Sequence, residues 1–256
     1  RNEKLKLIKG DIRDIAPLSK VVRANPYVVH LAAQAFIPLC YQMPLEVAEV
    51  DAIGSMNVFK ACPDSSIKRL VHISSSEVYG PAQHVPMNEK HPLQPYSTYS
   101  VAKMAADLWA QTLFWEHELP VVILRPFNAF GRRESLPYFI PAMIRQCLKE
   151  QIIQVGNLET SRDFTYIEDT TDAMIKALET KDIECEIINI GTSQTHKMKD
   201  ILTLIKKKTN AETKPVQEDK SRLRPRDVET LVTDNAEAKK ILGWTPKTTF
   251  EEGIQK

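Results

Sequence analysis

The stretch "RLVHISSSEVYG" (69–80) begins with a mainly apolar run, continues with three serines and a glutamate, and ends in a glycine. Continuous apolar runs of this length are typical of strands that are buried on both faces of a parallel sheet. Similar runs are "LKLI" (5–8), "YVVHLA" (27–32) and "VVILR" (121–125). Helical patterns lie between these runs, near 43–61 and 97–117. The alternation predicts an α/β fold with a doubly wound parallel sheet.

The predicted elements become less regular after residue 131. We expect helices near 137–149, 168–179 and 197–208, short strands near 152–155 and 187–190, and a charged surface loop at 214–227. The length suits one large α/β domain with a smaller lobe. We therefore predict a main domain over residues 1–131 and a smaller α/β lobe over residues 132–256, some segments of which return to the main sheet.

Composition argues against several classes of function. The 256 residues carry a formal net charge of +1 without a basic cluster, so neither nucleic acid nor an anionic membrane is an expected partner. No apolar run approaches the roughly 18 residues of a membrane span, and no signal peptide is recognisable. The four cysteines are scattered and have no neighbouring histidine, which argues against metal sites and disulfides. We expect a cytoplasmic protein in which His30 and His72 are core residues.

Two polar groups flank a long loop at 80–97, which carries four prolines. Long loops in compact domains are often functional. Before the loop, Glu77 is a solvated residue, a helix cap or a catalytic acid/base. After it, Tyr99 and Lys103 are four residues apart near a helix start and share one face. A neighbouring lysine lowers the pKa of a tyrosine and lets it act as a base, although a surface pair is the alternative.

An ordered series of motifs covers nearly the whole chain. The motifs are "GDIRD" (10–14), "HLAAQ" (30–34), "SSSEVYG" (74–80), "YSTYSVAK" (96–103), "RPFNAFG" (125–131), "RDFTYIEDT" (162–170), "RLRPRDVE" (222–229) and "LGW" (242–244). In this order they resemble the extended short-chain dehydrogenases/reductases, in the branch of NAD-dependent nucleotide-sugar epimerases and dehydratases. The resemblance implies a Rossmann-like NAD-binding domain at 1–131, a mainly substrate-binding lobe at 132–256, and a nucleotide-diphosphate sugar as substrate.

The resemblance also implies a role for individual residues. The cofactor NAD would be contacted by Asp11, Ile12, Leu31, Ala32, Ala33, Gln34, Tyr99, Lys103 and Phe127. The nucleotide sugar would be held by Ser75, Asn128, Arg162 and Arg224, the arginines meeting its diphosphate because a planar guanidinium matches phosphate oxygens. The catalytic residues would be Ser75, Ser76, Glu77, Tyr99 and Lys103. No metal is implied.

The sequence departs from the family pattern in two places. Asp51 stands where the family usually has asparagine, and a carboxylate there is expected to weaken contacts with the cofactor. The eight glycines form no GxxGxxG or GxGxxG loop, which would cradle the NAD pyrophosphate at a helix N-terminus. We interpret the sequence as lacking the first strand–helix–strand unit of a longer protein, and we expect weak NAD binding by residues 1–256 alone.

Glu77 distinguishes two reactions of the family. Both begin with oxidation of the sugar at C4, which makes the C5 proton acidic. A 4-epimerase then needs only the return of hydride to the other face, whereas a 4,6-dehydratase needs a carboxylate beside C5 and C6. Glu77 favours a dehydratase, and the following loop looks most like dehydratases of nonulosonate pathways. A 4-epimerase, another family reaction such as decarboxylation, and an inactive binding relative are the alternatives.

Two helices carry more apolar surface than one core face needs. They expose Met104, Leu108, Trp109, Thr112 and Trp115 near 97–117, and Val47, Val50, Met56, Val58 and Phe59 near 43–61. Relatives pair two such helices with those of a second copy. We therefore expect a homodimer, with coverage of the sheet as the alternative role of these residues.

Overall fold

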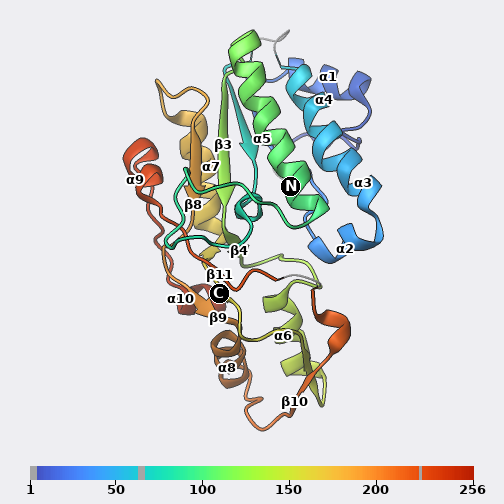
Figure 1. Ribbon diagram of the computed structural model, residues 1–256, viewed down its shortest axis with the longest axis vertical. Coiled ribbons are helices and arrows are strands. Elements are labelled where there is room, and N and C mark those ends of the chain that lie inside the picture. The colour runs from blue at the N-terminus through green and yellow to red at the C-terminus, as the bar shows by residue number, and fades with distance from the viewer. Residues whose placement is uncertain (1–4, 63–66, 225–226) are drawn as a thin grey trace. The chain divides into compact units, whose positions relative to one another are not determined.

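The computed structural model describes residues 5–62, 67–224 and 227–256. The α-helices are α1 (Ile15–Arg23), α2 (Ile37–Gln42), α3 (Pro44–Ala48), α4 (Ser55–Lys60), α5 (Thr98–His117), α6 (Phe139–Lys149), α7 (Ile167–Glu179), α8 (Met198–Lys208), α9 (Ala236–Leu242) and α10 (Phe250–Gln255). A π-helical segment, η1 (Glu49–Gly54), joins α3 to α4, and η2 (Ser76–Tyr79) and η3 (Lys220–Arg222) are 3₁₀ turns. Figure 1 shows these elements along the chain.

The longest strands form a parallel sheet with the order β1-β2-β3-β8. They are β1 (Tyr27–His30), β2 (Arg69–Ile73), β3 (Val121–Pro126) and β8 (Ile187–Ile190). Tyr27 pairs with Arg69 and His30 with His72, so β1 and β2 run in parallel register. The apolar runs at 69–74 and 121–125 therefore form buried strands, whereas the run at 27–32 forms a strand that is only partly buried, and the predicted α/β fold is confirmed.

The short strands pair in three further sheets. They are β4 (Asn128–Phe130) with β7 (Phe164–Tyr166), β5 (Ile153–Val155) with β10 (Val216–Glu218), and β6 (Ser161–Arg162) between β9 (His196–Lys197) and β11 (Thr230–Leu231). The predicted loop at 214–227 thus contains a strand, because Val216–Glu218 pairs in parallel with Ile153–Val155.

The strand predicted at residues 5–8 is wrong. This segment has no regular secondary structure, and Leu5 and Leu7 are 77% and 93% exposed. A strand becomes buried only where a neighbour supplies hydrogen bonds and a packing face. Among the described residues, no strand pairs with this segment.

The contacts divide the chain into two compact units. Unit 1 contains residues 1–73, 97–123 and 184–186, and unit 2 contains residues 74–96, 124–183 and 187–256. The sheet strand β3 contributes residues to both units. A functional division into a cofactor domain at 1–131 and a substrate lobe at 132–256 stays a prediction.

In unit 1, helix α5 packs against α3 and α4. Its N-terminus is fixed by a capping box in which the Ser97 hydroxyl accepts from the Ser100 backbone N–H and Ser100 accepts in return. Val47, Val58 and Phe59 are fully or almost fully buried in this unit, so they do not contribute the exposed face predicted for the helix at 43–61. Their burial follows from their position on the inward side of α3 and α4.

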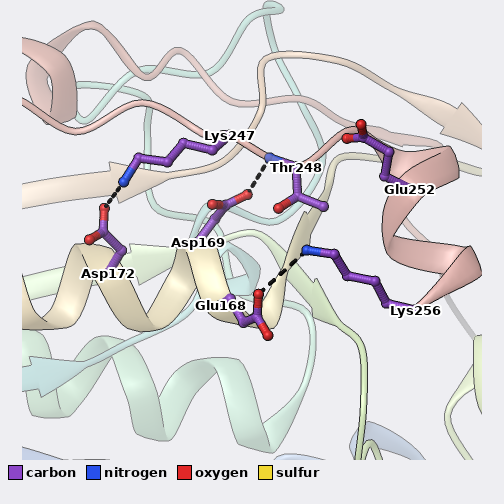
Figure 2. Close-up of a pocket in the computed structure, with 7 residues that line it drawn as sticks. All are labelled: Glu168, Asp169, Asp172, Lys247, Thr248, Glu252 and Lys256. Carbon is purple, nitrogen blue, oxygen red and sulfur yellow. Dashed lines mark hydrogen bonds and ion pairs between the residues drawn. The ribbon is translucent and has the colours of Figure 1, made fainter.

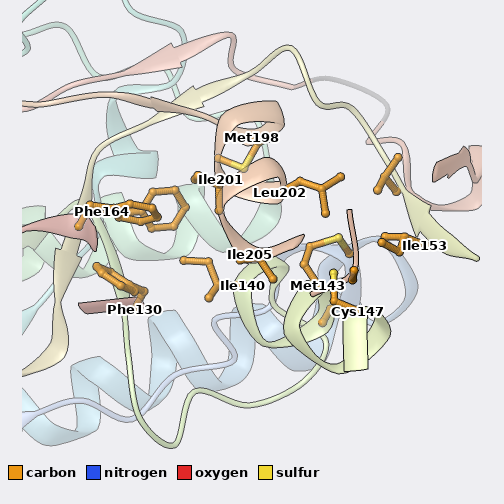
Figure 3. Packing of buried hydrophobic residues seen from close by; sticks show 14 of the residues in the cluster. Phe130, Ile140, Met143, Cys147, Ile153, Phe164, Met198, Ile201, Leu202 and Ile205 are labelled. Atoms are coloured by element: carbon orange, nitrogen blue, oxygen red, sulfur yellow. The ribbon is translucent and has the colours of Figure 1, made fainter. Parts of the chain in front are cut away.

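The core of unit 2 is a cluster of buried apolar side chains between α6 and α8 and the aromatic residues of β4, β7 and α10. Figure 3 shows Phe130 and Phe164 at one end of this cluster and Met143 and Cys147 at the other. Phe130 packs edge-to-face on Phe164, with ring centroids 5.9 Å apart. This core includes residues of β4, the strand that carries Asn128, and of β7, which follows Arg162 in the chain.

The remaining global predictions concern cysteines, metals and membranes. Cys40, Cys62, Cys147 and Cys185 are free thiols. Within the described ranges, no group of three or more His, Cys, Asp or Glu side chains is placed to hold a metal ion. None of the helices in the described part of the chain has the length and apolar character needed to cross a bilayer.

Candidate active site

The turn after β2 is held by its own side chains. Ser75 caps the 3₁₀ turn η2, because its hydroxyl oxygen accepts a hydrogen bond from the Glu77 backbone N–H at 3.2 Å. Ser75 is 8% exposed and Ser76 is 3% exposed. Since the Ser75 oxygen acts as an acceptor in this bond, its own O–H remains able to donate to another group.

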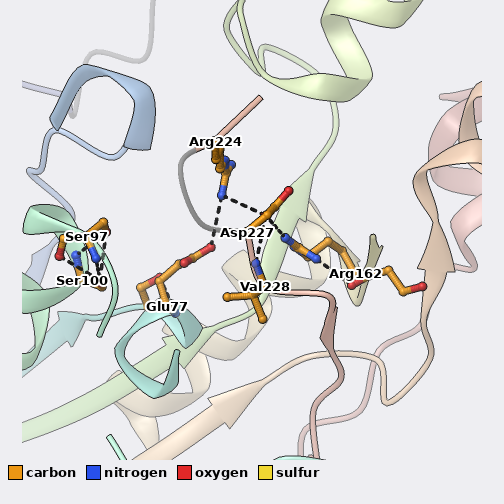
Figure 4. Close-up of polar contacts among 9 residues, drawn as sticks. Glu77, Ser97, Ser100, Arg162, Arg224, Asp227 and Val228 are labelled. Atoms are coloured by element: carbon orange, nitrogen blue, oxygen red, sulfur yellow. Dashed lines mark hydrogen bonds and ion pairs between the residues drawn. The ribbon is translucent and has the colours of Figure 1, made fainter. Parts of the chain in front are cut away.

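Glu77 faces a cluster of charged side chains from unit 2 (Figure 4). Its Oε1 lies 3.9 Å from Nη1 of Arg224, and the same Nη1 lies 3.9 Å from Oδ1 of Asp227. Asp227 also accepts a hydrogen bond of 2.9 Å from Nη2 of Arg162. We call Glu77, Arg162, Arg224 and Asp227 the charged cluster. It brings together three predicted site residues and one that was not predicted.

The two arginines of the charged cluster differ in environment. The Arg162 side chain is 7% exposed, and that of Arg224 is 33% exposed. Burial lowers the pKa of Arg162, while the charges of Asp227 and Glu77 raise it and that of Arg224 lowers it. A guanidinium keeps its charge in proteins, so burial makes Arg162 dependent on a nearby anion. Asp227 supplies that anion in this structure.

The loop that follows Glu77 is anchored by buried hydrogen bonds. Tyr79 donates to Oδ1 of Asn189 at 2.6 Å and accepts from Nη1 of Arg125 at 3.1 Å. Asn189 donates in turn to the Met87 carbonyl and, through its backbone N–H, to Glu89. The Phe127 ring lies 6.5 Å from the Tyr79 ring, and Phe127 is 4% exposed.

Gly80 ends the η2 turn in a conformation with φ of 67°. A Cβ at this position would lie 1.9 Å from the carbonyl oxygen of Gln94, which closes the loop. Both the positive φ and the close backbone approach require glycine. The position of Glu77 is therefore fixed from both sides of its turn.

Asn128 and Arg162 lie on short strands of two different sheets, β4 and β6. The Asn128 backbone N–H donates to the Asp163 carbonyl at 3.0 Å, and Asn128 pairs with Phe164 in the β4–β7 register. The Oδ1 atom of Asn128 is buried and has no hydrogen-bond partner among the described residues. Next to Arg162, the carboxylate of Asp163 accepts from the backbone N–H groups of Thr192, Ser193 and Thr233.

In unit 1, Lys103 is buried on α5 one turn after Tyr99. Its Nζ donates to the Ile73 carbonyl at the end of β2, at 2.8 Å. Lys103 is 2% exposed and Tyr99 is 7% exposed. Burial lowers the pKa of Lys103, and the carboxylates of Asp51 and Asp107 act in the opposite direction. The sequence spacing thus places both side chains on one buried face of α5, as expected.

Asp51 lies at the start of the buried polar region around Lys103. It is 0% exposed, and its Oδ1 accepts from the Gln34 backbone N–H at 2.7 Å. Burial raises the pKa of Asp51, whereas the Gln34 bond and the Lys103 charge lower it. Its Oδ2 is buried without a hydrogen-bond partner among the described residues.

The segment around Asp11 is tied to the same unit. Asp11 forms an ion pair of 2.7 Å with Arg13, whose hydrogen bonds lower the pKa of Asp11 to about 2. Asn57 on α4 donates to the carbonyls of Ile12 and Arg13. The Ile12 side chain lies so close to Gly54 that a Cβ there would approach Ile12 Cδ1 to 2.6 Å. After β1, Leu31 is 57% exposed and Ala32 is also exposed, whereas Ala33 is half-buried.

Comparison with known proteins identifies the family. A family model described as "GDP-mannose 4,6 dehydratase" matches residues 1–256. An uncharacterised protein of Methanocaldococcus jannaschii is 32% identical over 272 residues, which cover 100% of this chain and 80% of that protein. The dTDP-D-glucose 4,6-dehydratase of Mus musculus is 31% identical over 260 residues, which cover 98% of this chain and 72% of the relative.

The chain belongs to the nucleotide-sugar epimerase/dehydratase family of extended short-chain dehydrogenases/reductases. This family is enzymatic and NAD-dependent. A solved structure of UDP-glucuronic acid 4-epimerase from Bacillus cereus, in complex with UDP-glucuronic acid and NAD, has a TM-score of 0.92 and 27% identity. It matches 99% of this chain and 80% of that structure. The Rossmann-like fold expected from the motifs is confirmed.

The residues of unit 1 fit the NAD of this epimerase/dehydratase family. The segment Leu31–Gln34 follows β1, exposes Leu31 and Ala32, and is held by Asp51 through the Gln34 backbone N–H. The buried, unpartnered Oδ2 of Asp51 is a polar atom in need of a hydrogen-bonding group. Lys103 is held at the end of β2 by the Ile73 carbonyl. These features suit a dinucleotide at the carboxyl ends of the strands.

Two polar residues of this family member were missed by sequence reasoning. Asp227 lies within the motif "RLRPRDVE", in which only Arg224 was predicted to belong to the site. Glu134 follows β4, and burial raises its pKa to about 7; its Oε2 is buried and has no hydrogen-bond partner among the described residues. The sequence "GRRESLP" gives Glu134 the appearance of an exposed loop residue, so no sequence signal pointed to it.

Other charged residues of unit 2 line a surface pocket, and two of them, Glu168 and Asp169, belong to the motif "RDFTYIEDT". Figure 2 shows Lys247 beside Asp172 and Lys256 beside Glu168, with ion pairs of 3.3 and 3.5 Å. Asp169 accepts from the Thr248 backbone N–H at 2.8 Å. Since these polar groups satisfy one another and connect α7 to the C-terminal segment, we assign them a structural role.

The predicted core histidines lie in unit 1. His30 is 3% exposed and shares a hydrogen bond of 2.9 Å with the Ser55 hydroxyl, and burial lowers its pKa well below the usual value. His72 is fully buried and its Nε2 lies 3.4 Å from Oδ1 of Asp107. Both histidines are core residues, as the sequence predicted.

Proposed function

We propose that the protein is an NAD-dependent nucleotide-sugar 4,6-dehydratase. The observation that carries the proposal is the carboxylate of Glu77. It stands on a rigid turn, its side chain is 18% exposed, and its distance to Arg224 is 3.9 Å, too long for a hydrogen bond. A carboxylate that is fixed, reachable and not tightly bonded is suited to accept a proton from substrate.

The substrate is a nucleotide-diphosphate sugar. Arg162 and Arg224 bind its diphosphate, because guanidinium groups match phosphate oxygens in geometry and charge. The Oδ1 atom of Asn128, which has no hydrogen-bond partner among the described residues, accepts a hydrogen bond from a substrate hydroxyl. The names of the relatives support the class: they act on GDP-, dTDP- or UDP-linked sugars.

The first step removes two hydrogens from the sugar at C4. NAD supplies the chemistry of accepting and returning a hydride when it is bound. Tyr99 takes the proton of the 4-hydroxyl as a phenolate, which the Lys103 charge stabilises. The Ser75 O–H donates to the sugar and orients it, while its oxygen accepts from the Glu77 backbone N–H.

The following steps distinguish a dehydratase from an epimerase. The 4-ketone acidifies the C5 proton, which Glu77 accepts. Loss of the C6 hydroxyl as water then needs a proton, which Glu77 returns directly or Ser76 relays. Bound NAD would supply the hydride that C6 receives, and with a proton added at C5 the products would be the 4-keto-6-deoxy sugar and one water.

The test follows hydrogen at C5. The protein is incubated with NAD and a panel of dTDP-glucose, UDP-glucose, UDP-N-acetylglucosamine and GDP-mannose in deuterated water. We expect a 4-keto-6-deoxy product that carries solvent deuterium at C5. The Glu77→Gln variant should still oxidise C4 but eliminate about 10²–10⁴-fold more slowly, the usual contribution of a positioned base. Tyr99→Phe should abolish the signal of reduced nicotinamide.

Matched variants exclude indirect effects. Glu168→Gln changes an exposed carboxylate that pairs with Lys256 and should leave turnover within a few-fold. Interconversion of C4 epimers without deuterium at C5 would overturn the dehydratase and establish the 4-epimerase. Such an outcome has its own support, since the B. cereus structure with a TM-score of 0.92 is a 4-epimerase. Absence of any reaction with every sugar would favour an inactive binding relative.

A further inference from the structure

The buried carboxyl group of Asp51 has one oxygen with a partner and one without. Oδ1 accepts from the Gln34 backbone N–H at 2.7 Å. Oδ2 has almost no solvent exposure and no hydrogen-bond partner among the described residues. A buried polar atom without a partner is destabilising, so its presence calls for an explanation such as a group that binds there.

The position of Asp51 identifies what that group is. Gln34 ends the segment Leu31–Gln34, which carries the proposed path of the dinucleotide. The Asp51 backbone carbonyl accepts a hydrogen bond from the Ser55 hydroxyl, which also bonds His30. These bonds connect the π-helical segment that carries Asp51 to β1. The side chain therefore binds the last residue of this segment through Oδ1 and keeps Oδ2 for a further partner.

The charges around Asp51 decide its protonation state. Lys103 on α5 is the cation that acts on it, and Asp107, four residues after Lys103, is a second buried carboxylate beside the same ammonium group. His30, on β1, is kept neutral by burial, and His72, on β2, faces Asp107. Asp51 shares the ammonium group of Lys103 with Asp107, and its complete burial disfavours the charged form. The arrangement favours a neutral Asp51.

We propose that Asp51 is a positioning residue that works as a neutral acid: Oδ1 accepts from Gln34, and the proton on Oδ2 donates a hydrogen bond to an oxygen of the bound dinucleotide. A neutral acid combines one acceptor and one donor, as an asparagine amide does. This explains how aspartate serves at a place where the family usually has asparagine. An ionised carboxylate would offer only acceptors and would repel the phosphates of a dinucleotide.

The inference rests on the proposed NAD-binding role of Leu31–Gln34, so its first measurement needs no ligand. Infrared difference spectra between the protein and Asp51→Asn at pH 7 should contain the carbonyl band of a protonated carboxyl group. A carboxylate band in its place would overturn the proposal, whatever the activity of the enzyme. This result is independent of whether Glu77 acts in a dehydratase.

The second measurement is stability against pH. An acid whose pKa is raised on folding holds its proton more tightly in the folded state, so folding loses stability as the pH rises from the unfolded pKa through the folded one. Relative to Asp51→Asn, the protein should therefore lose stability as the pH rises above the unfolded pKa of an aspartate, about 4. Asp172→Asn, which changes a half-exposed carboxylate, provides the reference slope. Parallel curves for the protein and Asp51→Asn would contradict the proposal.

The third measurement is the binding of NAD and of ADP-ribose by calorimetry. Asp51→Asn keeps the donor and should bind both within about threefold of the unmodified protein, whereas Asp51→Val lacks it and should lose about tenfold, the worth of one hydrogen bond. A loss with both ligands places the acceptor oxygen in the ribose and phosphate part. A loss with NAD alone places it in the nicotinamide half. Equal binding by Asp51→Val would overturn the donor role, and binding weakened by Asp51→Asn alone would establish an ionised acceptor in its place.

Discussion

Asp227 is the residue whose removal should reveal most about the charged cluster. Its Oδ1 lies 2.9 Å from Nη2 of the buried Arg162, 3.9 Å from Nη1 of Arg224, and also accepts from the Val228 backbone N–H at 3.0 Å. The perturbation is Asp227→Asn, which keeps the shape and an acceptor but removes the charge. Arg162 then remains buried without the anion at its side.

The size of the effect follows from the burial of the pair. Removing one partner of a fully buried ion pair costs about 3–5 kcal/mol. Asp227 is 22% exposed, and asparagine still accepts one hydrogen bond, so we expect a smaller loss, about 2 kcal/mol. For a chain of this length that corresponds to a fall in Tm of about 4–8 °C.

The assay compares thermal unfolding with and without inorganic pyrophosphate. If Arg162 and Arg224 bind a diphosphate, pyrophosphate should replace the lost carboxylate and raise the Tm of Asp227→Asn more than that of the unmodified protein. The control is Asp172→Asn, which breaks an ion pair with the exposed Lys247 and should cost at most about 1 kcal/mol.

Two results would refute this reasoning. A change in stability no larger than that of Asp172→Asn would mean that Arg162 does not depend on Asp227. A normal loss of stability with equal pyrophosphate shifts in the two proteins would mean that the arginines pair with Asp227 for structural reasons and do not receive a diphosphate.

Three further predictions concern other parts of the chain. Gly80→Ala should lower stability by more than about 1 kcal/mol and reduce turnover, because the new Cβ would overlap the Gln94 carbonyl. Thermal unfolding followed by circular dichroism measures the stability, and product formation measures the turnover. An unchanged Tm would contradict the prediction. Burial raises the pKa of Glu134 to about 7, so folding loses stability as the pH rises from 4.5 to 7. Glu134→Gln should therefore raise stability above pH 7 but not at pH 4. Equal gains in stability at both pH values would exclude a titrating Glu134. The predicted homodimer should use the exposed Trp115 and Leu108 of α5. Light scattering should therefore detect a dimer of the unmodified protein and a monomer of Trp115→Glu. A monomeric unmodified protein at micromolar concentration would contradict the prediction.

The sequence was sufficient where local and tertiary preferences agree. Helix α5 has a serine cap, a long helical pattern and no helix breaker, so its limits could be predicted closely. The strand at 5–8 could not be judged in this way, because an apolar run becomes a strand only through a neighbour that the pattern does not contain. Strands of two residues such as β6 have too few positions for any periodicity.

The site was predictable only as far as motifs name its residues. Lys103, Glu77 and Arg162 stand in recognisable motifs, and the roles assigned to them stay predictions that the experiments above test. Asp227 and Glu134 needed the structure, because what distinguishes them is the partner of one and the burial of the other. Neither property is encoded in the residues beside them along the chain.

The anchored loop after Glu77 has a consequence for engineering. Its backbone is tied down at Tyr79, Met87 and Gln94, and the network from Arg125 to Asn189 passes beneath it. Grafting a whole loop from another enzyme would therefore remove contacts that the rest of the protein cannot replace. Libraries that aim at a new sugar should instead keep the backbone and vary exposed side chains such as that of Gln83, which bonds His91 through its backbone N–H.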